Sequence, residues 1–354
     1  MKKKKSTFLE TVLFLLVLAS VFLITKAKTT TTTHEFRLGC FNVENLGPAK
    51  GGRPAVMEVL AQVVRRYDVL FIQELSDKPP AGGVCGPDTG RVVCDLLARA
   101  GVARRLAVSA RLTATGSGAE QYALLYDPAQ FALEAAWVVN DSATGAPAYA
   151  TYMRPPMVAR LRSRRTGALL AAGVCHTRPR TAAAEVVALA HELAALEAHV
   201  APHAVLCGDF NAQFGAATWR RYYDALPGNG SAYGMEIANG VATGVLSGAT
   251  LDRVVTTPAL HARVAAARAF WFNDTARGGF SLAPVVEEGC GAYLGDRCTT
   301  QAATEAISDH FPVEVDIQLV GSSASRASIP SLLFLFFLLS FILFVVFVTP
   351  SLVY

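Results

Sequence analysis

Polar residues follow an apolar, strand-like run near the middle of this 354-residue chain. The run at residues 205–207 leads into Gly-Asp-Phe-Asn at residues 208–211, which puts a carboxylate, Asp209, two residues before a carboxamide, Asn211. Side chains two apart on a strand share a face, and ligand groups gather at the carboxyl ends of strands in α/β proteins. An acid and an amide held there suit a phosphate ester or a hydrated divalent cation. An ordinary exit from strand to turn would have the same sequence.

Other strand-like runs carry the same kind of polar residue at or near their ends. Taken singly, each such residue is more typical of a helix cap, a surface charge or a partly buried histidine. Burying all of them unpaired would be costly, which favours one shared site. The residues are Asn42, Gln73, Glu74, Glu120, His176, Asp209, Asn211, Asp252, Asp309 and His310.

The elements that must position these residues follow from hydrophobic periodicity. Apolar residues spaced as on one helix face predict helices over 54–67, 92–100 and 182–199. Shorter apolar runs predict strands over 35–42, 69–74, 122–126, 131–139, 157–161, 169–176, 205–209, 250–256, 262–272 and 311–319. Because Asp127-Pro128 separates the third and fourth of these strands, we expect them to form an antiparallel hairpin. Residues 273–305 are expected to be loop.

Strands in pairs, separated by long helices, predict an α/β fold of two packed, mainly antiparallel β-sheets flanked by helices, a four-layer sandwich. The boundaries expected for this domain are residues 35–320. Residues 29–34 read as a Thr-rich linker before it. Four arginines, at 160, 162, 164 and 165, gather at an expected hairpin tip, where a solvated turn is favoured over a phosphate contact.

Both ends of the chain carry apolar runs. Residues 1–28 combine a lysine-rich start with an apolar stretch, as in a signal peptide or an uncleaved signal anchor. Small residues and a polar spacer at 321–331 precede an apolar tail at 332–354. That layout favours a GPI-attachment signal, with a C-terminal transmembrane helix as the alternative. Either ending predicts a membrane-anchored protein of the cell surface or an endomembrane lumen.

The net charge of +4 comes from residues near the two ends of the chain. Six lysines and Glu10, all before Thr29, contribute +5, and Arg326 contributes +1, so the residues between carry −2. A domain so close to neutral has no overall basic field, and any binding of a polyanion must be local.

Seven cysteines fall into two kinds. Cys85 with Cys94, and Cys290 with Cys298, lie in loop-like segments and are candidate disulfides in an oxidising lumen. The others, at 40, 175 and 207, sit in strand-like runs and are expected to be small core residues. Glycosylation sequons at Asn140, Asn229 and Asn273 agree with a secretory route.

Five ordered motifs resemble those of the endonuclease/exonuclease/phosphatase superfamily. They are Cys-Phe-Asn-Val-Glu-Asn at 40–45, Phe-Ile-Gln-Glu at 71–74, Cys-His-Thr at 175–177, Gly-Asp-Phe-Asn at 208–211 and Ser-Asp-His-Phe-Pro at 308–312. Within this superfamily, the sequence is most similar to the secreted deoxyribonuclease I branch, which includes a GPI-anchored member. The similar segments are residues 63–74, 120–126 and 251–255, Asn140-Asp-Ser, and Arg-Pro-Pro-Met-Val at 154–158.

The resemblance implies roles for individual residues. Glu74, with Asn42 and Asp309, would hold Mg²⁺ or Mn²⁺ through few protein ligands and several waters. Asp209 and Asn211 would orient the scissile phosphate and the attacking water.

It also implies two proton-transfer pairs and a phosphate-binding cation. His310, paired with Asp252, would be the base that activates water, and His176, paired with Glu120, would protonate the leaving oxygen. Arg154 would neutralise a phosphate oxygen.

The sequence also departs from the branch. Ser76 and Gly118 stand where deoxyribonuclease I has an Arg and a Tyr that reach into the minor groove. Gln213 and Ala249 stand near a missing disulfide. The resemblance implies structural Ca²⁺ as well, but residues 240–246 lack the carboxylates of that site.

These patterns predict an Mg²⁺-dependent, membrane-anchored, monomeric endonuclease that holds DNA mainly through its backbone phosphates. One alternative is a phosphoesterase of the same fold acting on a lipid or inositol phosphate. Another is a non-catalytic surface binding domain.

Overall fold

The computed structural model describes residues 30–77, 85, 91–112, 120–139, 152–212, 215–288 and 299–323. Contacts along the chain group His34–Leu319 as one compact unit, and Met1–Thr33 with Val320–Tyr354 as another. Several expected features lie outside the described residues: the segments 1–28 and 332–354, the Asn140 sequon, Gly118, Gln213 and the Cys290–Cys298 pair. Across the part of the chain described here, no helix is long and apolar enough to cross a membrane.

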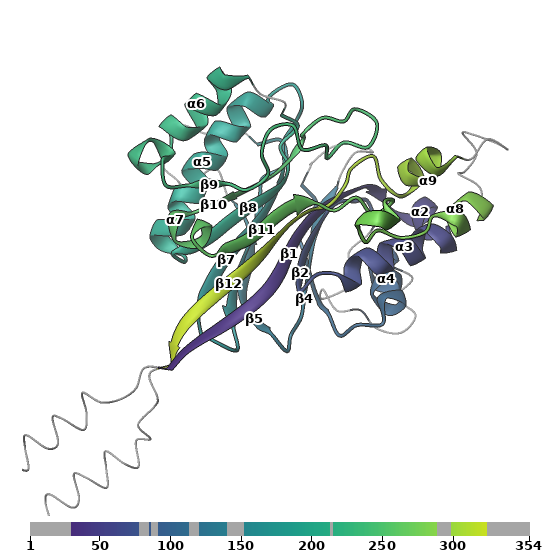
Figure 1. Cartoon of the computed structure of the whole chain (residues 1–354), viewed down its shortest axis with the longest axis horizontal. Coiled ribbons are helices and arrows are strands. Elements are labelled where there is room, and N and C mark those ends of the chain that lie inside the picture. The colour runs from purple at the N-terminus through teal and green to yellow at the C-terminus, as the bar shows by residue number, and fades with distance from the viewer. Residues whose placement is uncertain are drawn as a thin grey trace, which may run out of the picture. The chain divides into compact units, whose positions relative to one another are not determined.

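Two six-stranded sheets form the centre of the larger unit, with helices on their outer faces (Figure 1). The first has the order β11 (Val264–Ala269), β12 (Val313–Ser323), β1 (Thr30–Leu46), β2 (Val69–Leu75), β4 (Gln121–Tyr126) and β3 (Arg105–Val108). The second has the order β5 (Phe131–Val138), β6 (Met157–Ser163), β7 (Leu169–His176), β8 (His203–Asp209), β10 (Asp252–Thr256) and β9 (Gly234–Met235).

The sheets are mixed, with mostly antiparallel pairing. β1 runs parallel to β2, and β7 runs parallel to β8. The ladders β2–β4, β3–β4, β5–β6, β6–β7, β8–β10, β9–β10 and β11–β12 are antiparallel. The predicted fold class, two packed sheets flanked by helices, is therefore confirmed.

Helices cover the outer face of each sheet. They are α2 (Pro48–Gly51), α3 (Pro54–Arg65), α4 (Val92–Ala100), α5 (Ala182–His199), α6 (Ala216–Asp224), α7 (Pro258–His261), α8 (Ala283–Glu288) and α9 (Thr300–Ile307), with short 3₁₀ turns η3 (Pro227–Gly230) and η4 (Thr275–Arg277). One apolar cluster packs α3, α4, α8 and α9 on the first sheet, one fills the space between the sheets, and one packs α5 and α6 on the second.

The expected hairpin across Asp127-Pro128 is wrong. β4 pairs with β2 and β3 in the first sheet, whereas β5 pairs with β6 in the second, so the turn carries the chain from one sheet to the other. The amide of Asp127 donates to the carbonyl of Asp68, which holds the turn on the first sheet. A short turn between two strands is compatible with either arrangement, and local sequence does not choose between them.

The structure also corrects two other predictions. The segment 273–305 contains η4, α8 and α9, and both α8 and α9 pack against α3. Residues 289–298 of this segment lie outside the described part. The Thr-rich residues 30–34 extend β1 instead of forming a separate linker. Threonine is well suited to strands, and both ring nitrogens of His34 are bonded, to Ser163 Oγ at 2.8 Å and Gln130 Oε1 at 2.7 Å.

The cysteines divide by burial. Cys85 and Cys94 form a disulfide that ties the segment before α4 to that helix. Cys40, Cys175 and Cys207 are reduced and buried in strands of the two sheets.

Candidate active site

The predicted site residues meet where the ends of the two sheets adjoin. Hydrogen bonds link the sheets at this point: Gln73 Nε2, on β2, donates to the carbonyl of Cys175 on β7 at 2.7 Å. The amide of His176 donates to the hydroxyl of Tyr122, on β4, at 2.9 Å. Both hydrogen bonds are buried, so they fix the position of β2 and β4 relative to β7, the strands that carry the polar side chains.

Irregular backbone aims the side chains of the first sheet. The β1–β2 register shifts between Asn42 and Leu46, and the β2–β4 register shifts between Ile72 and Leu75. Glu74 has a φ of 58°, in the left-handed region that non-glycine residues seldom adopt. Such bulges re-aim a side chain at a strand end, and here they direct Glu74 toward the second sheet.

Glycine is required just before Asp209. Gly208 has a φ of 133°, and a Cβ at this position would lie 2.1 Å from the carbonyl oxygen of Cys175. The close approach of β7 and β8 that brings His176 opposite Asp209 in register therefore depends on the missing side chain.

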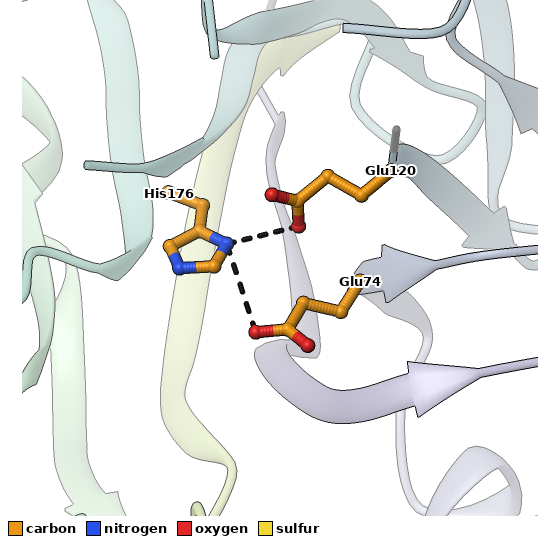
Figure 2. Close-up of side chains that lie close together, drawn as sticks. All are labelled: Glu74, Glu120 and His176. Carbon is orange, nitrogen blue, oxygen red and sulfur yellow. Dashed lines mark hydrogen bonds and ion pairs between the residues drawn. The ribbon is translucent and has the colours of Figure 1, made fainter. Parts of the chain in front are cut away.

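His176 is held by two carboxylates of the first sheet, as Figure 2 shows. Its Nδ1 lies 3.0 Å from Glu120 Oε2 and 4.0 Å from Glu74 Oε1. Glu120 also pairs with Arg154. The predicted His176–Glu120 pair is thus formed, with Nε2 left on the opposite side of the ring.

His310 repeats the arrangement from the other side of the site. Its Nδ1 is hydrogen-bonded to Asp252 Oδ2 at 2.7 Å. Asp252 lies opposite Asp209 in the β8–β10 ladder, which brings its side chain to the same sheet end. The ring is buried, so the Asp252 carboxylate orients it and sets which nitrogen faces the site.

Asp209 lies between the two histidines. Its Oδ2 is 3.5 Å from Nε2 of His176 and 3.5 Å from Nε2 of His310. Asn211 donates to the same carboxylate from its backbone amide at 2.7 Å and from Nδ2 at 3.1 Å. Two histidines, each anchored through Nδ1, therefore present Nε2 to one shared point.

The charges around the two rings differ. Burial lowers the pKa of His176, and Arg154 and His310 act in the same direction. Burial would also lower the pKa of His310, but Asp252, Asp209 and Asp309 outweigh it and raise that pKa to about 10. Burial and Asp252 raise the pKa of the Asp209 carboxyl. In the absence of a bound ion, these charges favour protonation of His310 over protonation of His176.

Arg154 lies at the site and has a hydrogen-bond donor that no described protein group uses. Burial lowers the pKa of its guanidinium, while Glu74, Glu185 and Asp209 stabilise its charge. Its Nη1 is buried and has no hydrogen-bond partner among the described residues. An unsatisfied buried cationic donor is costly unless an anion completes it, as a phosphate oxygen would.

Oxygen donors suited to a hard cation gather next to the histidines. Asn42 Nδ2 donates to Glu74 Oε1 at 3.0 Å, and Asp309, half exposed, has Oδ1 3.8 Å from His310 Nε2. Glu44 joins them: burial, Asp309 and Glu74 raise its pKa and outweigh the opposite effect of Lys50, whose Nζ lies 3.9 Å from Glu44 Oε2. Asn42 Oδ1 accepts from the amide of Glu44 at 3.0 Å, so the available ligand oxygens are those of the carboxylates, which fit Mg²⁺ or Mn²⁺.

Two triads also have ligand atoms within 4.8 Å of one another: Glu74, Glu120 and His176, and Asp209, Asp252 and His310. In both triads the histidine Nδ1 is already bonded to a carboxylate. Each triad could hold a metal ion only beside these existing histidine–carboxylate contacts.

Sequence reasoning missed three supporting residues. Glu44 is the third carboxylate. Lys50 donates to the carbonyls of Val43 at 2.6 Å and Ile307 at 2.8 Å, and burial lowers its pKa to about 8. Ser308 donates to the carbonyl of Asn42 at 2.7 Å. These contacts join the end of β1 to the loop that carries Asp309 and His310. Glu44 and Ser308 lay inside the recognised motifs, which was the signal available for them.

The profile of the Endonuclease/Exonuclease/phosphatase family matches residues 39–310, and the chain belongs to this family. It is thus an enzyme of a hydrolase family. Deoxyribonuclease-1-like 1 of Bos taurus is 28% identical over 292 residues, which cover 80% of this chain and 81% of that protein. Deoxyribonuclease-1 of Oryctolagus cuniculus is 25% identical over 299 residues, covering 83% and 97%. The resemblance to the deoxyribonuclease I branch is confirmed.

Solved structures share the fold at low identity. A family member from Bacteroides vulgatus superposes with a TM-score of 0.51 at 13% identity, covering 82% of this chain and 100% of that one. The catalytic domain of human nocturnin gives 0.50 at 14% identity, covering 83% and 98%.

Proposed function

We propose that this protein is a divalent-metal-dependent endonuclease that hydrolyses DNA phosphodiester bonds. The observation that carries the proposal is the pair of carboxylate-anchored histidines whose Nε2 atoms both lie 3.5 Å from Asp209 Oδ2. Hydrolysis of a phosphodiester needs one proton taken from water and one given to the leaving oxygen. Two imidazoles facing a common point can do both.

Each remaining side chain has a part in that step. Arg154 binds a non-bridging oxygen of the scissile phosphate through the buried Nη1 that lacks a protein partner. Asp209 and Asn211 orient the phosphate and the water between the two rings. Glu120 and Asp252 hold the rings and stabilise whichever is charged.

Asn42, Glu74 and Asp309, with Glu44 added by the geometry, would hold Mg²⁺ or Mn²⁺. A bound divalent ion supplies Lewis acidity for the charge that develops on phosphate oxygens. These residues alone leave several coordination positions for water or substrate, as Mg²⁺ prefers.

DNA is the proposed substrate because the two relatives named above carry the name deoxyribonuclease. Ser76, in place of the Arg of that branch, removes one groove contact, so we expect backbone contacts to dominate. We further propose a monomer in the secretory pathway, held at a membrane by its C-terminal segment. Structural Ca²⁺ is not needed in this account, because residues 240–246 offer no carboxylate.

A substrate panel tests the proposal. The purified protein is given supercoiled plasmid, a phosphocholine lipid and inositol phosphates, each with Mg²⁺ and with EDTA. We expect Mg²⁺-dependent nicking of the plasmid and little turnover of the others. Release of phosphocholine or phosphate without nicking would instead identify a lipid or inositol phosphoesterase of the same fold.

A further inference from the structure

The loop between β7 and α5 is rigidly attached to the site. Thr177 donates from its amide to Asp209 at 3.0 Å and from Oγ1 to Phe210 at 2.6 Å, both to carbonyl oxygens. In return, Asn211 Nδ2 donates to the carbonyl of Thr177 at 2.8 Å. Residues 177–181, which we name the β7–α5 loop, therefore keep a fixed position beside His176.

A buried carboxylate that takes no part in proton transfer holds the far side of this loop. Glu185, on α5, has no exposed surface. It accepts from Thr181 Oγ1 at 2.5 Å and from the amide of Arg178 at 3.3 Å. Burial raises the pKa of Glu185, a cost that the loop contacts offset. The other three residues of the loop are Arg178, Pro179 and Arg180, and these contacts hold their backbone in place.

The two arginines of the loop have guanidinium groups without protein partners in the described part of the chain. Neither guanidinium, of Arg178 or of Arg180, makes a hydrogen bond or an ion pair within the residues the structure describes. Arg178 also stands close enough to Arg154 for their like charges to repel each other. Arg178 is partly buried and Arg180 is exposed, so both guanidinium groups are accessible to an anion bound beside the site.

We propose that the β7–α5 loop is a second phosphate subsite, in which Arg178 and Arg180 bind a backbone phosphate next to the scissile one. This rests on the proposed nuclease function and specifies a polynucleotide, since a substrate with a single phosphate has nothing to place there. It also supplies local cationic contacts on a domain that has no overall basic field.

The test compares two double variants with the same change of charge. Arg178→Ala/Arg180→Ala removes the subsite. Arg164→Ala/Arg165→Ala removes two exposed arginines at the β6–β7 turn, separated from His176 by β7, about 23 Å of strand. Steady-state rates are measured on duplex DNA and on bis(4-nitrophenyl) phosphate, a diester without a neighbouring phosphate.

We expect the subsite variant to raise KM for DNA about tenfold or more at constant kcat, and to change hydrolysis of the small diester less than about twofold. Its plot of log kcat/KM against log salt should be shallower by about one, the value for the loss of one phosphate contact, and the control variant should match wild type. The single variant Arg180→Ala, which changes only the exposed arginine, should show a smaller rise in KM for DNA.

Equal losses on both substrates would overturn the subsite, since the arginines would then act on the catalytic geometry. Unchanged kinetics on DNA would overturn it as well. If the wild-type protein hydrolyses the small diester but not DNA, the proposed function itself fails, and that result is distinct from either outcome for the variants.

Discussion

At the scale of single residues, the two histidines are the groups whose loss should be most damaging. His176→Ala or His310→Ala removes one of the two proton-transfer groups, and we expect kcat to fall about 10³-fold. The measurement is the initial rate of DNA hydrolysis, together with urea unfolding to establish that each variant folds.

His191→Ala is the matched control for this prediction. His191 is exposed on α5 and contacts none of the site residues, so its rate should stay near that of wild type. A rate within a few-fold of wild type for His176→Ala or His310→Ala would remove that histidine from the mechanism.

The charges around His310 give a prediction about pH. In the metal-free protein, nuclear magnetic resonance titration should show this ring protonated at pH 8, since its pKa is raised to about 10. Asp252→Asn removes the carboxylate bonded to Nδ1 and should bring the pKa down toward about 6.5.

The same shift affects folding. A histidine whose pKa is higher in the folded state stabilises the fold below about pH 6.5, and that contribution is lost as the pH rises toward 10. The free energy of unfolding of wild type should therefore fall relative to Asp252→Asn across this range. A His310 that titrates near pH 6.5 in wild type would contradict the electrostatic account.

Much of the residue-level site could be predicted because its members are chemically distinctive and stand at strand ends. The predicted pairs His176–Glu120 and His310–Asp252 are both present in the structure. The difference in charge around the two rings could not be predicted, because it depends on how many carboxylates surround each ring. Lys50 was missed because an isolated lysine after a Pro-Ala turn gives no sign that it becomes buried.

At the scale of elements, the close approach of β7 and β8 is the feature most sensitive to sequence. Gly208→Ala would force a Cβ against the Cys175 carbonyl and a non-glycine residue to a φ of 133°. We expect it to lower the free energy of unfolding by about 2 kcal/mol or more and to displace Asp209, so that activity falls as well.

Chemical denaturation and the DNA rate of Gly208→Ala measure both effects. Gly167→Ala is the control: Gly167 also has a positive φ, at 73°, but a Cβ there meets nothing within 4 Å. It should cost stability through backbone strain alone and leave activity unchanged. Equal stability of Gly208→Ala and wild type would show that the strands can separate without penalty.

Helices were predicted best where one face is buried in full. α3 buries Val56, Val59, Leu60, Val63 and Val64, the spacing visible in the sequence. α8 and α9 were missed because they are short, and the periodicity of six or eight residues is weak. The bulge at Glu74 and the crossing from β4 to β5 were not predictable, since both depend on which strand becomes the neighbour.

At the scale of the whole molecule, the proposed anchor is the main open prediction. If the C-terminal segment is a GPI-attachment signal, phosphatidylinositol-specific phospholipase should release the protein from the surface of expressing cells. The released fraction is measured by immunoblot of the medium. Retention after this treatment, with release only by detergent, would favour a C-terminal transmembrane helix.

The most direct test of the central claim is plasmid nicking by wild type and by Asp209→Asn, which keeps the shape of the side chain between the two histidines. We predict that wild type converts supercoiled plasmid to open circles in Mg²⁺ and not in EDTA, and that Asp209→Asn does so about 10³-fold more slowly. Nicking that survives EDTA, or an Asp209→Asn rate close to that of wild type, would contradict a metal-dependent hydrolytic site at this position.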